Sequence, residues 1–136
     1  MTLVSGRPRS YAPPAMNKYY SRAAIDHFLH PRNARVMDAP SGVGVAVNKA
    51  DDTVTFYVRL EGGAVTEASF QAQGCAATIA TASIATETLR GLSVAEARAL
   101  TVEHLADALG GLPAFKVERA LVTVSALGAA LDDATK

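Results

Sequence analysis

The sequence contains a single cysteine, Cys75, and no tryptophan in 136 residues. One cysteine cannot form an intramolecular disulfide, and it cannot by itself hold a metal ion or a cluster. No apolar run approaches the roughly 18 residues of a membrane span. An excess of one charge is also missing, since thirteen Lys and Arg balance thirteen Asp and Glu. This balance excludes the basic surface by which proteins bind nucleic acid unaided. We therefore expect a cytoplasmic protein with no nucleic-acid partner and no membrane insertion.

The common catalytic motifs are missing too. The chain has no glycine-rich phosphate loop, no CxxC pair, no HExxH helix and no GxSxG elbow. Its length and its hydrophobic content of 49% are enough to bury one core. The sequence therefore predicts a single domain and points to no generic reaction.

The first residues differ in composition from the rest of the chain. Residues 1–15 contain two arginines and three prolines but no acidic residue and no apolar signal stretch. We predict that residues 1–16 are a disordered extension and that residues 17–136 form the domain. A short transit peptide is the alternative, although Pro13 and Pro14 would interrupt the helix that it needs. Met16 is an alternative start.

The first half of the domain predicts one helix and three strands. Ser21 is placed to cap a short amphipathic helix that ends before Pro31. Residues 32–52 hold alternating valines with glycines, which indicates a loop leading into a strand. The runs TVTFYVRL and AVTEASFQAQG flank Gly62-Gly63. Because β-branched and aromatic residues alternate on both sides of residues that accept positive φ, this stretch predicts a β-hairpin.

The second half predicts only helices. An alanine-rich helix follows Cys75, and Ser93 and Thr101 are placed to cap two short helices. A last amphipathic helix is predicted from about Phe115 to Leu131. Strands grouped before helices indicate an α+β fold, with helices packed on one face of a three-stranded antiparallel sheet.

Few residues are candidates for chemistry. Cys75 opens a helix, where free N–H groups and the helix dipole favour a thiolate, but free cysteines are also common as small core residues. His27 and His30 share a helix face, as two metal ligands would; without a third donor at a matching offset, we interpret His27 as a packing or hydrogen-bonding residue. Asp51 and Asp52 are most simply interpreted as solvated turn charges.

Three segments together resemble a known family. The run YSRAAIDHFLHPRN, the Gly74-Cys75 pair opening an Ala/Ser-rich helix, and LPAFK before the last helix resemble iron–sulfur cluster assembly scaffold proteins, the IscU/NifU-like family. The resemblance covers about residues 20–131. It implies the IscU/NifU-N-like fold and a protein that is not an enzyme. The implied partners are a cysteine desulfurase, or other assembly or client proteins. LPAFK resembles the LPPVK-type segment that a chaperone reads, with Ala114 and Phe115 changed.

The resemblance also implies a ligand set. Family members use three cysteines and an aspartate, with a histidine beside the third cysteine, to assemble a [2Fe-2S] cluster or hold zinc. Here the second cysteine falls on Cys75 and the aspartate on Asp52. The first cysteine falls on Ala50, and the histidine–cysteine pair falls on Glu118 and Arg119. Two of the three thiolates are therefore replaced.

The residues that remain allow two interpretations of the site. Cys75, Asp52 and Glu118 could form an open, oxygen-rich site for zinc or ferrous iron, completed by water or by a partner. Alternatively, Arg119 pairs with Asp52 or Glu118, and a salt bridge has replaced the metal. We favour the replacement, because a guanidinium repels a metal ion beside it.

Three functions follow from these interpretations. The favoured one is a non-catalytic scaffold homologue in iron–sulfur or metal metabolism, which binds assembly partners or shares a metal with one through Cys75. The second is a structural or regulatory interaction subunit without metal. The third is a persulfide relay through Cys75, which needs an accessible thiolate of low pKa, whereas Asp52 and Glu118 would raise that pKa.

Overall fold

The computed structural model describes residues 18–136. The predicted extension, its transit-peptide alternative and Met16 lie outside the described residues. The elements, in chain order, are α2 (Arg22–Leu29), β1 (Gly42–Val47), β2 (Thr53–Glu61), β3 (Ala64–Gln73), α3 (Ala76–Leu89), α4 (Val94–Arg98), α5 (Val102–Ala108), α6 (Ala114–Val117), the 3-10 helix η1 (Glu118–Ala120) and α7 (Leu121–Ala134). Within residues 18–136, no helix is long and apolar enough to cross a membrane.

The three strands form one antiparallel sheet in the order β1-β2-β3. The predicted hairpin is confirmed: β2 and β3 are joined at Gly62 and Gly63, whose φ angles of 61° and 79° are positive. Ser21 caps α2 as predicted, because its hydroxyl accepts a hydrogen bond from the N–H of Ala24 at 3.0 Å. The sequence pattern therefore locates the sheet and the first helix correctly.

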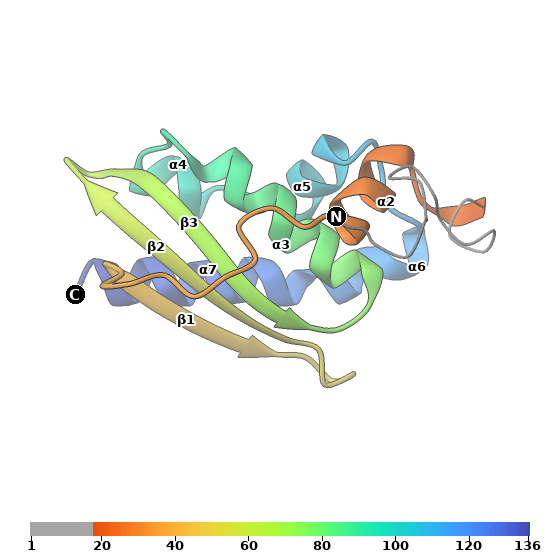
Figure 1. Ribbon diagram of the computed structural model, residues 1–136, viewed down its shortest axis with the longest axis horizontal. Helices are drawn as coiled ribbons and strands as arrows, with labels where there is room; N and C mark the ends of the chain where they lie inside the picture. The colour runs from red at the N-terminus through yellow and green to blue at the C-terminus, as the bar shows by residue number, and fades with distance from the viewer. Residues whose placement is uncertain (1–17) are drawn as a thin grey trace.

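One face of the sheet is covered by helices, which confirms the predicted α+β architecture. Helix α7 runs along β1 and β2, and α3 lies against β3 (Figure 1). Between these layers lies the core, whose largest fully buried side chains include Phe56, Phe70, Leu89, Leu105, Leu127 and Leu131. Burial of this apolar surface holds the helices on the sheet.

The opposite face of the sheet is crossed by the segment 30–41, which is orange in Figure 1. At the β3 edge the carbonyl of Asn33 accepts from the N–H of Phe70 at 3.0 Å. Over the sheet, the guanidinium of Arg59 donates to the carbonyls of Asp38 and Ala39 at 2.7 and 2.9 Å. At the far side the N–H of Ser41 donates to Val58, and the chain enters β1. The segment thus leads directly from α2 to the edge strand.

The end of the chain differs from the prediction of one helix from about Phe115 to Leu131. The structure divides this stretch into the four-residue α6, the 3-10 helix η1 and the long α7. A periodic apolar pattern does not resolve a tightened turn of three residues. Here the carbonyl of Arg119 faces the side-chain amide of Asn48 at 3.4 Å, so a tertiary contact accompanies the break. The 3-10 helix η1 directs the side chain of Arg119 toward the β1–β2 turn.

Candidate functional site

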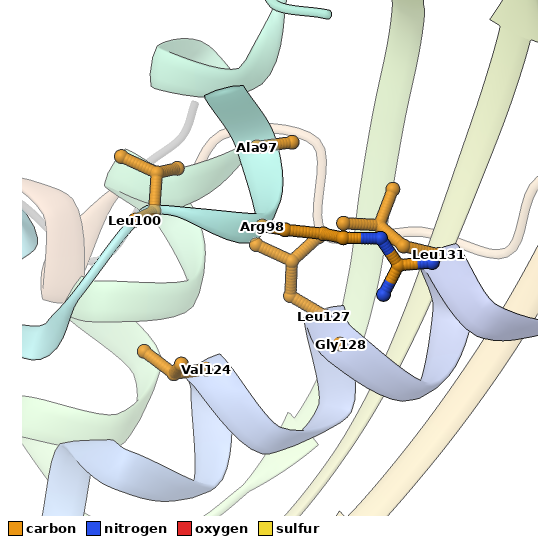
Figure 2. A pocket seen from close by; sticks show the side chains of 7 residues that line it. All are labelled: Ala97, Arg98, Leu100, Val124, Leu127, Gly128 and Leu131. Carbon is orange, nitrogen blue, oxygen red and sulfur yellow. The ribbon is translucent and has the colours of Figure 1, made fainter. Parts of the chain in front are cut away.

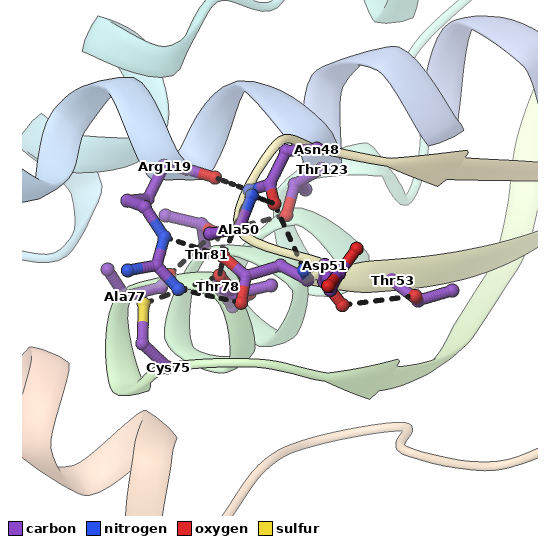
Figure 3. A network of polar contacts seen from close by, with 11 residues as sticks. Asn48, Ala50, Asp51, Thr53, Cys75, Ala77, Thr78, Thr81, Arg119 and Thr123 are labelled. Carbon is purple, nitrogen blue, oxygen red and sulfur yellow. Dashed lines mark hydrogen bonds and ion pairs between the residues drawn. The ribbon is translucent and has the colours of Figure 1, made fainter.

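Asp52 and Arg119 form a bidentate ion pair at the centre of the candidate site. Figure 3 shows Arg119 within the network of polar contacts. The Nε of Arg119 donates to Oδ2 of Asp52 at 2.8 Å, and Nη2 donates to Oδ1 at 2.8 Å. Of the two predicted partners for Arg119, Asp52 is the one that the structure selects. Its side chain is buried, with the residue 3% exposed, so its interpretation as a solvated turn charge was wrong. Burial is tolerated because the charge is fully paired.

A tight turn between β1 and β2 holds the Asp52 carboxylate in place. The side-chain oxygen of Asn48 accepts from the N–H groups of Ala50 and Asp52 at 2.9 and 3.0 Å. Its amide nitrogen donates to Oδ2 of Asp52 at 2.9 Å. Asp51 adopts a φ of 64°, which aspartate tolerates better than most residues. Asn48 was missed in the sequence, where an Asn at a strand end before a turn is the only signal.

Gly74 leaves the space that the carboxylate occupies. A Cβ added at Gly74 would lie 2.8 Å from Oδ1 of Asp52, closer than real contacts allow. Gly74 is therefore required because a Cβ at this position would collide with Asp52 of the β1–β2 turn, and not because of its own backbone conformation. Any larger residue here would push Asp52 away from Arg119.

The hydrogen bonds to Asp52 strongly favour its ionised form. The pKa of Asp52 is lowered from 3.8 to about 2, first by the hydrogen bonds from Arg119, against the opposing effect of burial, and then by Asn48 and Thr78. All of these groups donate to the carboxylate oxygens. Asp52 is thus a permanently charged anchor at ordinary pH.

Cys75 is the N-cap residue of α3 and is partly exposed. Burial alone would raise the pKa of its thiol. The hydroxyl of Thr78, the N–H groups of Thr78 and Ala77, and the charge of Lys116 outweigh burial, so the pKa is lowered overall. The structure therefore bears out the sequence argument that a helix start favours the thiolate.

Thr78 links the thiol to the ion pair. Its hydroxyl donates to Oδ2 of Asp52 at 3.2 Å and lies 3.5 Å from Sγ of Cys75. A hydroxyl has one proton, so it cannot donate to the carboxylate and to a thiolate at the same time. When Cys75 ionises, the hydroxyl of Thr78 can donate to the thiolate only by giving up its hydrogen bond to Asp52. Asp52 then keeps its hydrogen bonds from Arg119 and Asn48.

The other positions taken over from the family pattern bring no side chain to this network. Glu118 and Ala50 are both exposed; Ala50 contributes only its backbone N–H to Asn48, and Glu118 makes none of the contacts described above. Within residues 18–136, no group of three or more His, Cys, Asp or Glu side chains is arranged to hold a metal ion. A cluster normally takes four cysteine or histidine ligands, so one thiol and a carboxylate occupied by Arg119 fit it poorly. The predicted ligand set of Cys75, Asp52 and Glu118 stays a prediction.

A basic and aromatic surface includes Lys116, whose charge acts on Cys75. Tyr19 and Phe115 are 50% and 64% exposed, and their rings meet edge to face at 5.6 Å. The ammonium of Lys18 lies 5.5 Å from the centre of the Tyr19 ring, and that of Lys116 lies 6.0 Å from the centre of the Phe115 ring. We call these four residues the aromatic rim. Exposed aromatic side chains within a polar surround are typical of protein-binding surfaces.

His27 has the packing role expected from the sequence. It is buried between α2 and α3, where its Nδ1 lies 2.7 Å from the hydroxyl of Ser83. The same hydroxyl accepts from the N–H of Arg32 at 2.9 Å, so Ser83 ties His27 to the chain that follows α2. Burial, and then the charge of Arg32, lower the pKa of His27. A neutral His27 is a structural link and not a metal ligand in this arrangement.

A small hollow of about 130 Å³ lies between α4 and α7 (Figure 2). It is lined mainly by apolar side chains and by Arg98, whose guanidinium pairs with Asp132 at 2.6 Å. It shares no residue with the Asp52–Arg119 network. The candidate site is therefore the network and the surface around Cys75.

Comparisons with known proteins identify NifU-like and IscU relatives. The model of the family described as "NifU-like N terminal domain" matches residues 19–136. The chain is 38% identical over 115 residues to the iron-sulfur cluster assembly scaffold protein IscU 1 of Archaeoglobus fulgidus, covering 84% of this chain and 75% of that protein. It is 42% identical over 109 residues to the nitrogen fixation protein NifU of Cereibacter sphaeroides, covering 79% of this chain and 44% of that longer protein.

Solved structures agree on the fold. A NifU-like protein (N-terminal) from Brucella abortus superposes with a TM-score of 0.71 at 17% identity, covering 88% of this chain and 96% of that one. A putative scaffold protein for the SUF system from Fervidobacterium islandicum AW-1 gives 0.68 at 20% identity, covering 82% and 96%. At these identities the likeness concerns the fold.

Proposed function

Because the chain belongs to the NifU-like N-terminal domain family of iron–sulfur cluster assembly scaffolds, we propose that it is a scaffold homologue in which an ion pair stands in place of the metal. In this proposal Arg119 occupies the position of a cysteine ligand and binds Asp52. The protein then acts as a non-catalytic partner of assembly proteins rather than as the place where a cluster is built.

The bidentate Asp52–Arg119 pair carries this proposal. Both carboxylate oxygens accept from the guanidinium, so Asp52 has to give up Arg119 before it could bind a metal. The guanidinium is also a fixed positive charge, and it would repel an iron or zinc ion beside Cys75. In this proposal the guanidinium of Arg119 supplies the positive charge that a metal ion would otherwise supply beside Asp52.

The proposal is tested by metal and acid-labile sulfide content after purification without oxygen. The wild-type protein is expected to contain less than stoichiometric iron or zinc. The double variant Ala50→Cys with Arg119→Cys restores two thiolates and is expected to bind zinc, whereas Arg119→Met is the control that removes the charge without adding a ligand. Stoichiometric metal in the wild type that is lost in Cys75→Ala would overturn the replacement and support the ligand set of Cys75, Asp52 and Glu118.

Partner binding is proposed to use the aromatic rim. Phe115 is 64% exposed and lies beside Tyr19 and the ammonium of Lys116, so it can enter an apolar pocket while the cation meets acidic groups of the partner. A cysteine desulfurase is the partner that the family favours. Phe115→Ala is expected to weaken binding to the desulfurase at least about tenfold, and Leu121→Ala, also exposed, is the matched control. If Phe115→Ala and Leu121→Ala bind the desulfurase equally well, the aromatic rim is not the binding surface.

A second candidate function is acceptance of sulfur by Cys75. The sequence argument against it was the acidity of Asp52 and Glu118, but Arg119 neutralises Asp52 and the pKa of Cys75 is lowered. The thiolate would attack the terminal sulfur of an enzyme persulfide, forming a new S–S bond while the enzyme cysteine leaves as a thiolate. Intact-mass measurement after incubation with a desulfurase and cysteine should then show one added sulfur on the wild type and none on Cys75→Ala.

A further inference from the structure

β1 has an edge that differs from the usual protected edge strand. It lies at one side of the sheet, and among residues 18–136 it pairs only with β2 (Figure 1). Its sequence, GVGVAV, contains no charged residue and no proline. Natural edge strands normally carry lysines, prolines or bulges that prevent pairing with another chain. Here those devices are missing from the strand itself.

The two faces of β1 have different surroundings. A Cβ added at Gly44 would lie 2.2 Å from the N atom of Ala130, so the strand rests directly on the backbone of α7. The opposite face carries Val43, Val45 and Val47, of which the last two are 57% and 59% exposed. The contact with α7 fixes the register of the strand and keeps these valines outside.

Hydrogen bonds show which backbone groups point away from the sheet. The N–H of Asn48 donates to the carbonyl of Asp52 at 3.1 Å, so the backbone N–H of this residue points toward β2. The N–H of Val43 instead donates to the side chain of Asp133 at 3.0 Å, on the outer side. Since antiparallel strands alternate, the N–H and C=O groups of Val45 and Val47 also point outward.

We propose that this edge pairs with the same edge of a second copy of the chain, in an antiparallel register that places Val45 opposite Val47 of the other copy. This register forms about four backbone hydrogen bonds and joins the two sheets into one of six strands. It gathers four exposed valines on one face, which pairs apolar side chains with apolar side chains. It also leaves the hydrogen bond between Val43 and Asp133 intact.

Charge complementarity supports a second copy as the occupant. In this register Lys49, which is exposed and lies in the turn just after β1, comes opposite Val43 of the other copy. The carboxylate of Asp133 lies at that Val43 and pairs with Lys136 of its own copy, so each copy offers a second cation to the anion of the other. The strand between these charges is neutral, and the arrangement is symmetric about Ala46. A twofold axis through Ala46 therefore gives the same contact between Lys49 and Asp133 at both ends of the paired strands.

The test is sedimentation equilibrium over micromolar to millimolar protein concentrations. The wild type is expected to approach the mass of two chains, and Val47→Lys should raise the dissociation constant at least about tenfold. Val36→Lys is the matched control, because Val36 is 57% exposed but lies outside the sheet. Hydrogen exchange should also show slower exchange of the Val45 and Val47 amides in the dimer.

Two outcomes would overturn the proposal. The first is a wild type that stays monomeric throughout this range. The second is a dimer that Val47→Lys and Val36→Lys affect equally, because such a dimer uses another surface. Lys49→Glu provides an independent check, since it should weaken the dimer and make the dissociation constant less sensitive to salt. None of these results depends on metal content or on partner binding.

Discussion

The Asp52–Arg119 pair should make stability depend on pH in a defined window. Arg119→Met removes the guanidinium but keeps an apolar stem of similar length. The pKa of Asp52 is lowered from 3.8 to about 2 in the folded protein. This lowering of the pKa corresponds to about 2 kcal/mol of folding free energy. Because the folded pKa lies below the unfolded one, this contribution is present above about pH 4 and is lost as pH falls toward 2.

Urea unfolding followed by circular dichroism, at a series of pH values from 7 down to about 2.5, measures this contribution. At pH 7 we expect Arg119→Met to lower the free energy of unfolding by about 2 kcal/mol, and the difference from wild type should shrink as the pH approaches 2. Adding Asp52→Asn should recover part of the loss, because no unpaired carboxylate then stays buried. The control is Arg98→Met, which breaks an exposed pair with Asp132 and should cost less than about 1 kcal/mol. A loss below about 0.5 kcal/mol for Arg119→Met, or one that is constant with pH, would show that the charge of Asp52 does not depend on Arg119 for its stabilising effect.

Three further predictions test other parts of the structure. Gly44→Ala should destabilise the protein by about 2 kcal/mol or more in urea unfolding, since its Cβ meets the backbone of α7, whereas Gly128→Ala has open space and should be neutral or slightly stabilising. The imidazole of His27 should titrate below pH 6.5 by NMR. Because its folded pKa is lowered, its stabilising contribution is present above pH 6.5 and is lost as pH falls through the folded value; Arg32→Met, which removes a charge that lowers this pKa, should raise it. Thr78→Val should raise the pKa of Cys75, seen as slower alkylation at neutral pH, and Thr88→Val on the same helix should leave the rate unchanged.

The sheet could be predicted because its signals are local. Gly62 and Gly63 accept positive φ between alternating runs, and Ser21 caps the helix that follows it, so neighbouring residues decide the structure. The break between α6 and α7 could not be predicted. It involves Arg119, whose side chain reaches a strand 67 positions earlier in the sequence, and periodicity carries no information about such a contact.

The candidate site could be predicted only in part. The family resemblance pointed to Asp52 and Arg119, but left open whether Arg119 would pair with Asp52 or Glu118. The roles of Asn48 and Gly74 depend on how the β1–β2 turn lies against the start of α3, and that contact exists only in the folded chain. Polar networks of this kind are set by tertiary geometry rather than by spacing.

The close fit of β1 on α7 has a consequence for the order of events during synthesis. Val43 and Asp133 are 90 positions apart in sequence, yet they meet, and the glycines of β1 lie on the backbone of α7. The strands and α3 leave the ribosome first, while the helix that covers β1 and β2 follows much later. A long loop must therefore close before the core is complete, which slows folding and leaves apolar strands uncovered in the nascent chain. During that interval the growing polypeptide is a natural client for general chaperones that bind exposed apolar strands.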